Sequence, residues 1–389
     1  MTYCIAWKSE SAVFLAADAA ITSDAAPELE RSTFGEKHGR LGGRMDGPYV
    51  QEEALKLHVI HDCAVTFSGT VSVGDRIISE MDAALAGGAG ALEAFSKATA
   101  ARDPNSHVKM ILAYRQHGLP RLATYNASGD RQVTEDVERV FFGSMKDAYD
   151  ELTEKFLDTF LALEATPQRI LAQALGLLQS YGIHDYLIED GVGGGFCGLY
   201  VDPSGVHWQP DILYVVAHPQ LADVGGVGSF ATDNVWCLFS SLTAAGKIVF
   251  AHLAEGESGE LRRQRVSPIA RRLEEKQDRC EFDYVIVLNT SQHIVCVIEL
   301  LGQREHDLLV VEPHPTLERT LGIYWSPRVQ GLFDTILVPE GCSASPDHIC
   351  VQFIPYRPLA NALSPDSRRD MQAKWEEAQG ANGTGAYTG

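Results

Sequence analysis

The sequence predicts an α+β protein of more than one domain. Short apolar runs rich in β-branched and aromatic residues are typical of strands, and longer segments carry apolar residues at helical spacing. The chain has 389 residues, of which 45% are hydrophobic, so it can bury a large core and is long for a single domain.

The first expected elements are two strands joined by a polar turn. Residues 3–7 and 12–17 are apolar runs typical of half-buried strands, and residues 8–11 between them are polar. A hairpin of this kind returns Asp18 beside Thr2.

Helices and further strands are expected along the following two hundred residues. Apolar residues at helical spacing, and Gly- or Pro-containing turns between apolar runs, mark them. The helices are expected at residues 73–85, 90–101, 145–163 and 167–181. The strands are expected at residues 56–60, 64–69, 108–115, 121–125, 196–201, 206–208, 213–216, 235–239 and 248–252.

The C-terminal third is expected to consist mainly of strands. Strands are expected there at residues 282–289, 294–301, 308–312, 336–339 and 349–355, with few helices between them. We therefore divide the chain into a first domain at 1–254, a charged helical linker at 255–280, a small β-rich domain at 281–378 and a flexible tail at 379–389. Assembly, gating of an active site and partner recruitment are the roles expected for the β-rich domain.

Four features at the start of the chain occur in an ordered series: Thr2, Asp18, Lys56 and the run Phe67-Ser68-Gly69. Together they resemble the N-terminal nucleophile (Ntn) hydrolases of the proteasome β-subunit type. The opening Met-Thr-Tyr-Cys is most similar to the bacterial Anbu branch, and the HslV peptidase is a more distant relative. The interval of 18 − 2 = 16 positions between Thr2 and Asp18 is also the family interval. The resemblance covers roughly residues 1–253.

The resemblance implies a four-layer αββα sandwich, in which the helices at 145–163 and 167–181 form one outer layer. It also implies roles for individual residues. Thr2 falls on the family's nucleophile, Asp18 on its buried aspartate and Lys56 on its lysine, while Gly69 falls on the glycine whose N–H forms the oxyanion hole.

Four further positions match family motifs. Ser144, in Phe-Phe-Gly-Ser, corresponds to a supporting serine, and Asp190, in Asp-Gly-Val-Gly-Gly, to a second supporting aspartate. The resemblance implies substrate binding at Thr22 and Phe67.

Three departures from the family pattern are visible. Gly193 stands where the family usually has a serine, and Ala20 replaces a common arginine. The long insertion before Lys56 contains Lys37, a competing candidate for the lysine; Lys56 is preferred because it opens a strand that leads to Ser-Gly.

The proposed chemistry explains these residue types. Removal of Met1 would leave Thr2 with both a hydroxyl and an α-amine, and an amine with a pKa of about 7.7–8.0 is a suitable base at neutral pH. A protonated Lys56 nearby would disfavour the ammonium form of that amine, and Asp18 would hold the lysine. The Gly69 N–H would stabilise the oxyanion. The expected reaction is hydrolysis of an amide, such as a peptide bond, through an ester on Thr2.

Each residue also has a structural explanation. Asp18 could cap a turn, Lys56 could be a solvated strand end, Ser144 could be the N-cap of the following helix, and Asp190 could belong to a loop. Their occurrence together and in order favours the site.

The composition and charge of the chain disfavour several classes of partner and ligand. The net charge of −20 argues against nucleic acid or an anionic membrane as a partner, and no apolar run is long enough for a transmembrane helix. We expect a cytoplasmic protein whose eight cysteines are mostly reduced core thiols. Neither the histidines nor the cysteines show metal-ligand spacing, and the Gly-rich run at 191–195 lacks the Gly-Lys-Ser/Thr of a phosphate loop. No cofactor and no metal are therefore expected.

Three functions remain open. The leading one is a threonine peptidase that assembles into a ring or ring-like homo-oligomer, an assembly implied by the family. The second is an amidase that acts on small molecules with the same nucleophile. The third is an inactive proteasome-like scaffold, for which Thr2→Ala would leave biological function intact.

Overall fold

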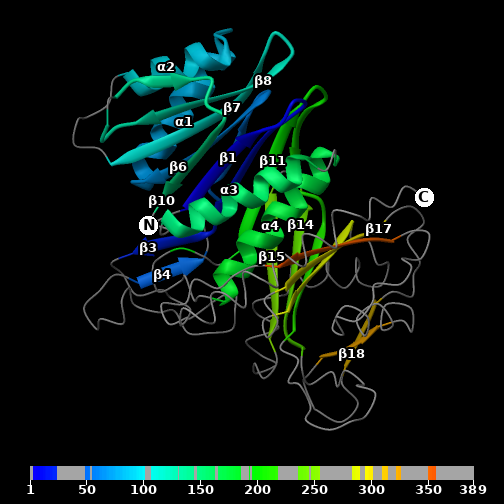
Figure 1. Ribbon diagram of the computed structural model, residues 1–389. Coiled ribbons are helices and arrows are strands. Elements are labelled where there is room, and N and C mark those ends of the chain that lie inside the picture. Colours follow the sequence, from blue (N-terminus) through cyan, green and yellow to red (C-terminus); the bar gives the residue numbers. More distant parts are fainter. Residues whose placement is uncertain are drawn as a thin grey trace.

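The computed structural model describes the chain in segments. These are residues 3–23, 49–52, 55–100, 107–129, 131–143, 147–162, 165–184, 192, 195–217, 235–244, 247–254, 283–289, 294–300, 309–313, 321–325 and 349–355. They form an α+β fold with four helices and several sheets (Figure 1).

The N-terminal hairpin lies in the middle of a five-stranded antiparallel sheet, which we call the first sheet. Its order is β10-β1-β2-β11-β12, and Cys4 pairs with Ala17 between β1 and β2. The strands are β1 Tyr3–Lys8, β2 Val13–Asp18, β10 Arg139–Gly143, β11 Phe196–Asp202 and β12 Gly205–Trp208. Both faces of β1 and β2 are apolar because both faces are covered, so the sequence shows a continuous apolar run rather than strict alternation.

A second five-stranded antiparallel sheet packs on the first. It has the order β5-β6-β7-β8-β9, with β5 Leu57–Ile60, β6 Cys63–Gly69, β7 Val108–Gln116, β8 Leu119–Asn126 and β9 Val133–Glu135. Small and branched side chains fill the space between the two sheets, among them Leu15, Ala64 and Ile111. Helices α1 Val71–Ala86 and α2 Ala91–Ala100 cover the far face of the second sheet through Ile77, Met81 and Phe95.

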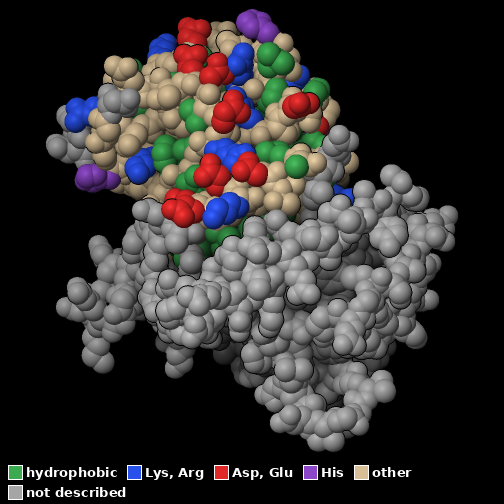
Figure 2. Space-filling model, viewed as in Figure 1, with side chains coloured by type: hydrophobic (Ala, Val, Ile, Leu, Met, Phe, Trp, Pro, Cys, Tyr) green, Lys and Arg blue, Asp and Glu red, His purple; other side chains and the backbone are tan. Residues whose placement is uncertain are grey.

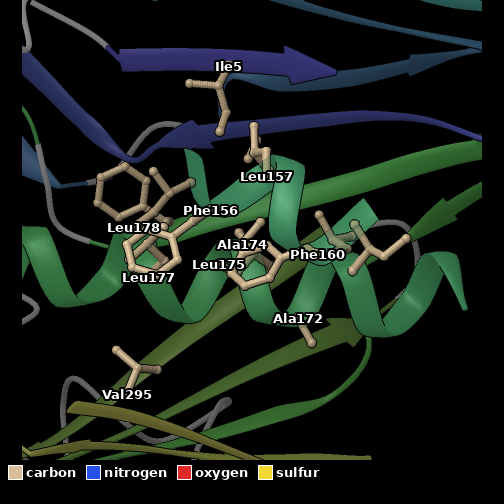
Figure 3. Packing of buried hydrophobic residues seen from close by; sticks show 14 of the residues in the cluster. Ile5, Phe156, Leu157, Phe160, Ala172, Ala174, Leu175, Leu177, Leu178 and Val295 are labelled. Carbon is tan, nitrogen blue, oxygen red and sulfur yellow. The ribbon is translucent and has the colours of Figure 1, made fainter. Parts of the chain in front are cut away.

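Helices α3 Asp147–Ala162 and α4 Pro167–His184 cover the other face of the first sheet. Phe156, Phe160 and Leu175 belong to one buried cluster with Ile5 of β1 (Figure 3). Helix α4 approaches β11 closely: a Cβ at Gly198 would lie 2.7 Å from Leu171 Cδ1. Only glycine at position 198 permits this contact without a shift of the leucine.

A six-stranded sheet, which we call the third sheet, covers the opposite side of α4. Its order is β15-β14-β13-β16-β17-β20, with β13 and β16 parallel and the other pairs antiparallel. The strands are β13 Ile212–Ala217, β14 Val235–Ala244, β15 Lys247–Ala254, β16 Tyr284–Asn289, β17 Ile294–Leu300 and β20 Ile349–Pro355. A Cβ at Gly176 of α4 would lie 3.2 Å from both Ile286 and Val295. The expectation that α4 lies in an outer layer is therefore wrong. The helix is buried between the first sheet and the third sheet.

The third sheet takes strands from both sides of the predicted linker at 255–280, which itself lies outside the described residues. Two small antiparallel pairs complete the described strands: β3 Ala20–Ser23 with β4 Tyr49–Glu52, and β18 Leu309–Pro313 with β19 Leu321–Trp325. The expected strand at 336–339 and the tail at 379–389 lie outside the described residues.

The predicted helices are confirmed within three residues at each end. Of the described helices, none is long and apolar enough to cross a membrane. On the described part of the face seen in Figure 2, acidic and basic side chains are interspersed rather than gathered by sign. Among the described residues, ion pairs with an exposed carboxylate include Lys8 with Glu138 and Arg139 with Asp158.

Candidate active site

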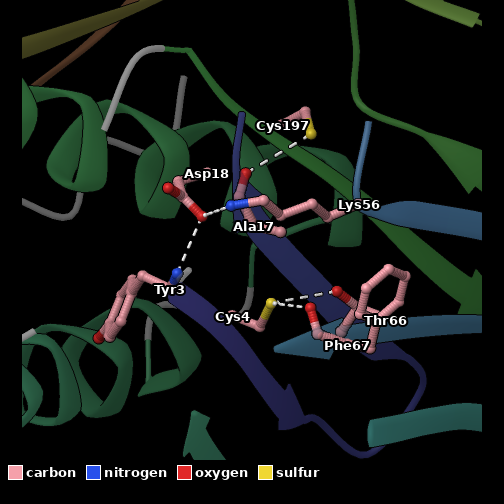
Figure 4. A network of polar contacts seen from close by, with 8 residues as sticks. All are labelled: Tyr3, Cys4, Ala17, Asp18, Lys56, Thr66, Phe67 and Cys197. Atoms are coloured by element: carbon pink, nitrogen blue, oxygen red, sulfur yellow. Dashed lines mark hydrogen bonds and ion pairs between the residues drawn. The ribbon is translucent and has the colours of Figure 1, made fainter. Parts of the chain in front are cut away.

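A buried ion pair lies where the first and second sheets meet, at the end of β2 and the start of β5. The Nζ atom of Lys56 lies 2.6 Å from Asp18 Oδ1, and the two side chains are 4% and 0% exposed. The backbone N–H of Tyr3 donates to the same carboxylate oxygen at 2.8 Å (Figure 4). One carboxylate therefore joins the start of β1, the end of β2 and the residue before β5.

Strand pairing explains this arrangement. The register of β1 with β2 places Cys4 opposite Ala17, so Asp18 comes beside Tyr3. Asp18 is paired on its other side with Phe196 of β11. Lys56 comes from the second sheet, where the next residue, Leu57, pairs with Thr66. The pair thus links the two sheets across their interface.

The burial of this pair favours a functional role. Removing a carboxylate and an ammonium from water costs several kcal/mol for each ion, so a buried pair is often no more stable than an apolar replacement. Charged groups retained in such surroundings are common at functional sites, where a fixed charge is needed. The Asp18–Lys56 pair is therefore a candidate for a catalytic role as well as for a role in joining the two sheets.

Two buried thiols lie close to the pair. Cys4 Sγ donates to the Phe67 carbonyl at 3.3 Å and accepts from the Thr66 hydroxyl at 3.2 Å, and Cys197 Sγ donates to the Ala17 carbonyl at 3.5 Å. Burial raises the pKa of Cys4 to about 12, although the Lys56 charge acts in the opposite direction. Burial, reinforced by the Asp18 charge, also raises the pKa of Cys197. Both thiols stay protonated at neutral pH, so neither is a nucleophile.

Gly69 ends β6 in a conformation that requires glycine. Its φ is +118°, and a Cβ there would lie 1.9 Å from the His107 carbonyl oxygen. Unlike the buried ion pair, Gly69 is exposed. Its backbone is therefore fixed and accessible at the end of the strand that pairs with β5.

The two expected substrate-binding residues, Phe67 and Thr22, lie in different strands. Phe67 is buried, and its ring packs against the His58 ring at a centroid distance of 5.9 Å and directly against Gly74 of α1. It therefore contributes to the core under α1. Thr22 lies in β3, where it pairs with Val50, and the structure describes its backbone alone.

Of the expected catalytic residues, the structure brings Asp18 and Lys56 together. Thr2, Ser144 and Asp190 lie outside the described residues, as do Met1, Lys37 and Gly193. Tyr3 and Gly143, the described residues next to Thr2 and Ser144, pair with each other in the first sheet. Gly195, five positions after Asp190, accepts a hydrogen bond from the Ala19 N–H at 2.9 Å.

One contact near this site was not expected from the sequence. The Tyr3 hydroxyl donates to Asp150 Oδ1 of α3 at 2.8 Å. The two residues are 147 positions apart, so no local pattern connects them. The only available signal is general, namely that a tyrosine on a buried strand needs a partner for its hydroxyl.

A second polar cluster lies in the turn between β11 and β12. Asp202 Oδ1, Ser204 Oγ and His207 Nε2 lie within 3.1 Å of one another. The same histidine nitrogen faces both partners, whereas a catalytic triad needs one nitrogen for the serine and the other for the carboxylate. Partial burial alone would raise the pKa of Asp202, but hydrogen bonds from the Ser204 hydroxyl and amide, together with His207, outweigh it and lower that pKa. The cluster stabilises the turn.

Within the described segments, no group of three or more His, Cys, Asp and Glu residues is placed to hold a metal ion. No protein-family model matches the chain, and the search of the curated proteins found no match.

Proposed function

We propose that this chain is an Ntn hydrolase of the proteasome β-subunit type, which cleaves amide bonds with Thr2 after removal of Met1. The observation that carries the proposal is the buried Lys56–Asp18 pair. The Asp18 carboxylate also accepts a hydrogen bond from the backbone N–H of Tyr3. The Tyr3 nitrogen is bonded to the carbonyl carbon of Thr2. The hydrogen bond that this N–H donates to Asp18 therefore constrains the chain next to the proposed nucleophile.

The packing of the described elements supports the same proposal. Two antiparallel sheets pack face to face, with α1 and α2 on one far face and α3 and α4 on the other. This arrangement is compatible with the αββα sandwich of the Ntn hydrolases. The third sheet, beyond α4, would be an addition to that sandwich.

The proposed reaction has two stages. The Thr2 hydroxyl oxygen attacks the substrate carbonyl carbon, and the hydroxyl proton passes to the α-amine of the same residue. The Gly69 N–H stabilises the tetrahedral oxyanion. The ammonium then returns the proton to the leaving nitrogen, which breaks the amide bond and leaves an ester on Thr2. Water hydrolyses the ester with the same amine as base.

Lys56 would act through its charge in this reaction. A fixed positive charge near the α-amine disfavours the ammonium form and so keeps the base neutral. Burial strengthens the effect, because a low local dielectric screens the charge less than water does. Asp18 would hold the Lys56 ammonium in place and, through the Tyr3 amide, the start of β1.

Intact-mass analysis with a peptide epoxyketone tests the proposal, because this electrophile reacts with both the hydroxyl and the α-amine of an N-terminal threonine. We expect loss of Met1 and a single adduct on Thr2, with no adduct in Thr2→Ala. Lys56→Met should react far more slowly than Lys8→Met, a matched control whose lysine lies 2.7 Å from the exposed carboxylate of Glu138. Retention of Met1, or an adduct on another residue, would contradict the proposal.

A substrate panel distinguishes the alternatives. Faster hydrolysis of peptides than of glutamine-like amides supports the peptidase, and the reverse supports the amidase. Loss of Met1 without any adduct or turnover would support the inactive scaffold. Sedimentation velocity measures the proposed ring-like homo-oligomer, and a monomer at working concentrations would exclude it.

A further inference from the structure

Tyr3 is held at two points by elements far apart in the sequence. Its backbone N–H donates to Asp18 of β2 at 2.8 Å, and its hydroxyl donates to Asp150 of α3 at 2.8 Å. The residue is 1% exposed. Its position is therefore fixed both along the strand and across the interface with α3.

The bond to Asp150 is a strong one. Hydrogen bonds to a charged group contribute more to stability than bonds between neutral groups do. Burial, reinforced by the Asp150 charge, raises the pKa of the Tyr3 phenol, so the phenol remains a donor at neutral and mildly alkaline pH. The bond to Asp150 is therefore present throughout the range in which an α-amine could act as a base.

The elements around the Tyr3 hydroxyl are packed against one another. The strand pairing of Tyr3 with Gly143 brings β1 next to the end of β10, and α3 begins four residues later at Asp147. Tyr149 of α3 packs on Tyr181 of α4 with a centroid distance of 5.0 Å. The acceptor for the Tyr3 hydroxyl thus comes from a helix that is packed on both β1 and α4.

We propose that Tyr3 is a positioning residue, whose hydroxyl bond to Asp150 anchors the start of β1 and thereby orients Thr2 against the Lys56–Asp18 pair. The inference rests on the proposed function. A terminal residue has one covalent neighbour and frays unless it is held. Since the efficiency of a bound nucleophile depends on its placement within about 1 Å, the anchor sets the rate of attack.

The test compares Tyr3→Phe with Tyr181→Phe. Both substitutions remove one hydroxyl from a buried ring near α3, and Thr153 donates to the Tyr181 hydroxyl at 3.5 Å. We expect Tyr3→Phe to lower kcat and the rate of adduct formation on Thr2 by roughly 10- to 100-fold with little change in KM. Tyr181→Phe should leave kcat and the rate of adduct formation unchanged, and it should lower the melting temperature less than Tyr3→Phe because the bond that it removes is longer and uncharged.

A rescue variant separates hydrogen bonding from charge. Asp150→Asn keeps an acceptor oxygen for the Tyr3 hydroxyl and should retain most of the activity, whereas Asp150→Ala should behave like Tyr3→Phe. Equal kcat values in Tyr3→Phe and Tyr181→Phe, or a change confined to KM, would overturn the proposal.

Trimming by an aminopeptidase, followed by intact mass, measures the anchor without relying on activity. We expect several-fold faster trimming of Tyr3→Phe than of the unmodified protein, and no change for Tyr181→Phe. If the unmodified protein forms no adduct, the proposed function fails and this measurement still decides on the anchor. Faster trimming of Tyr3→Phe alone then supports it, and equal trimming of both variants overturns it.

Discussion

Replacing Lys56 by methionine should destabilise the fold by about 3–5 kcal/mol, because it leaves a buried carboxylate without its cation. The Lys56 and Asp18 side chains are 4% and 0% exposed and their charged atoms are 2.6 Å apart, so solvent cannot take the place of the ammonium. The Tyr3 amide also donates to the Asp18 carboxylate, but it carries no charge. Methionine keeps most of the apolar volume of the lysine stem, so the loss reports the charge rather than a cavity.

Lys8→Met provides the matched control. Lys8 lies 2.7 Å from Glu138, almost the same distance, but the Glu138 side chain is 79% exposed. Water solvates that carboxylate after the substitution, so the expected loss is below about 1 kcal/mol. The Lys8 side chain is itself only 10% exposed, so burial of the carboxylate is the main difference between the two pairs.

Urea unfolding followed by intrinsic fluorescence measures both variants, and the double variant Asp18→Asn with Lys56→Met completes the comparison. The double variant should lose less unfolding free energy than the two single variants lose in sum, because neither charge of the pair remains. Two results would refute the reasoning: a loss in Lys56→Met no larger than in Lys8→Met, or strict additivity in the double variant.

Three further predictions follow from the described residues. Gly69→Ala should lower the melting temperature far more than Gly205→Ala, whose φ is also positive at +134° but whose Cβ would meet no atom within 4 Å; equal losses would contradict the steric reason. The Cys4 thiol, with a pKa raised to about 12, should resist iodoacetamide in the folded protein and react in urea, as peptide mapping by mass spectrometry can measure. Ser204→Ala should raise the pKa of Asp202. In the unmodified protein the stabilisation from this lowered pKa is present above the unfolded-state pKa of the carboxyl and is lost as pH falls through the folded-state value. NMR titration of the carboxyl carbon tests this, and an unchanged midpoint would show that the serine does not contribute.

Elements with a local signal were predicted well. The hairpin of β1 and β2 and the four described helices follow from apolar patterning and turn residues within about twenty positions. The short strands β3, β4, β9 and β19 were not predicted. The reason is physical: short strands form because a neighbouring segment pairs with them, and their own sequences carry little pattern.

The candidate site was predicted in part. The order of Asp18 and Lys56 along the chain, with a strand leading to Gly69, suggested that they belong together. The sequence could not show that both side chains are buried and in contact, because this depends on how the two sheets pack. It also gave no sign of the bond between Tyr3 and Asp150, which joins residues 147 positions apart.

By itself, the sequence determined the α+β class, the hairpin that returns Asp18 to the start of the chain, and most helix positions, because these depend on contacts between near neighbours. Only the tertiary structure decided that α4 is covered on both sides and that strands from residue 212 to residue 355 share one sheet. Such pairings depend on which distant segments complement each other in shape and hydrogen bonding, and the pattern within one segment does not specify its partner.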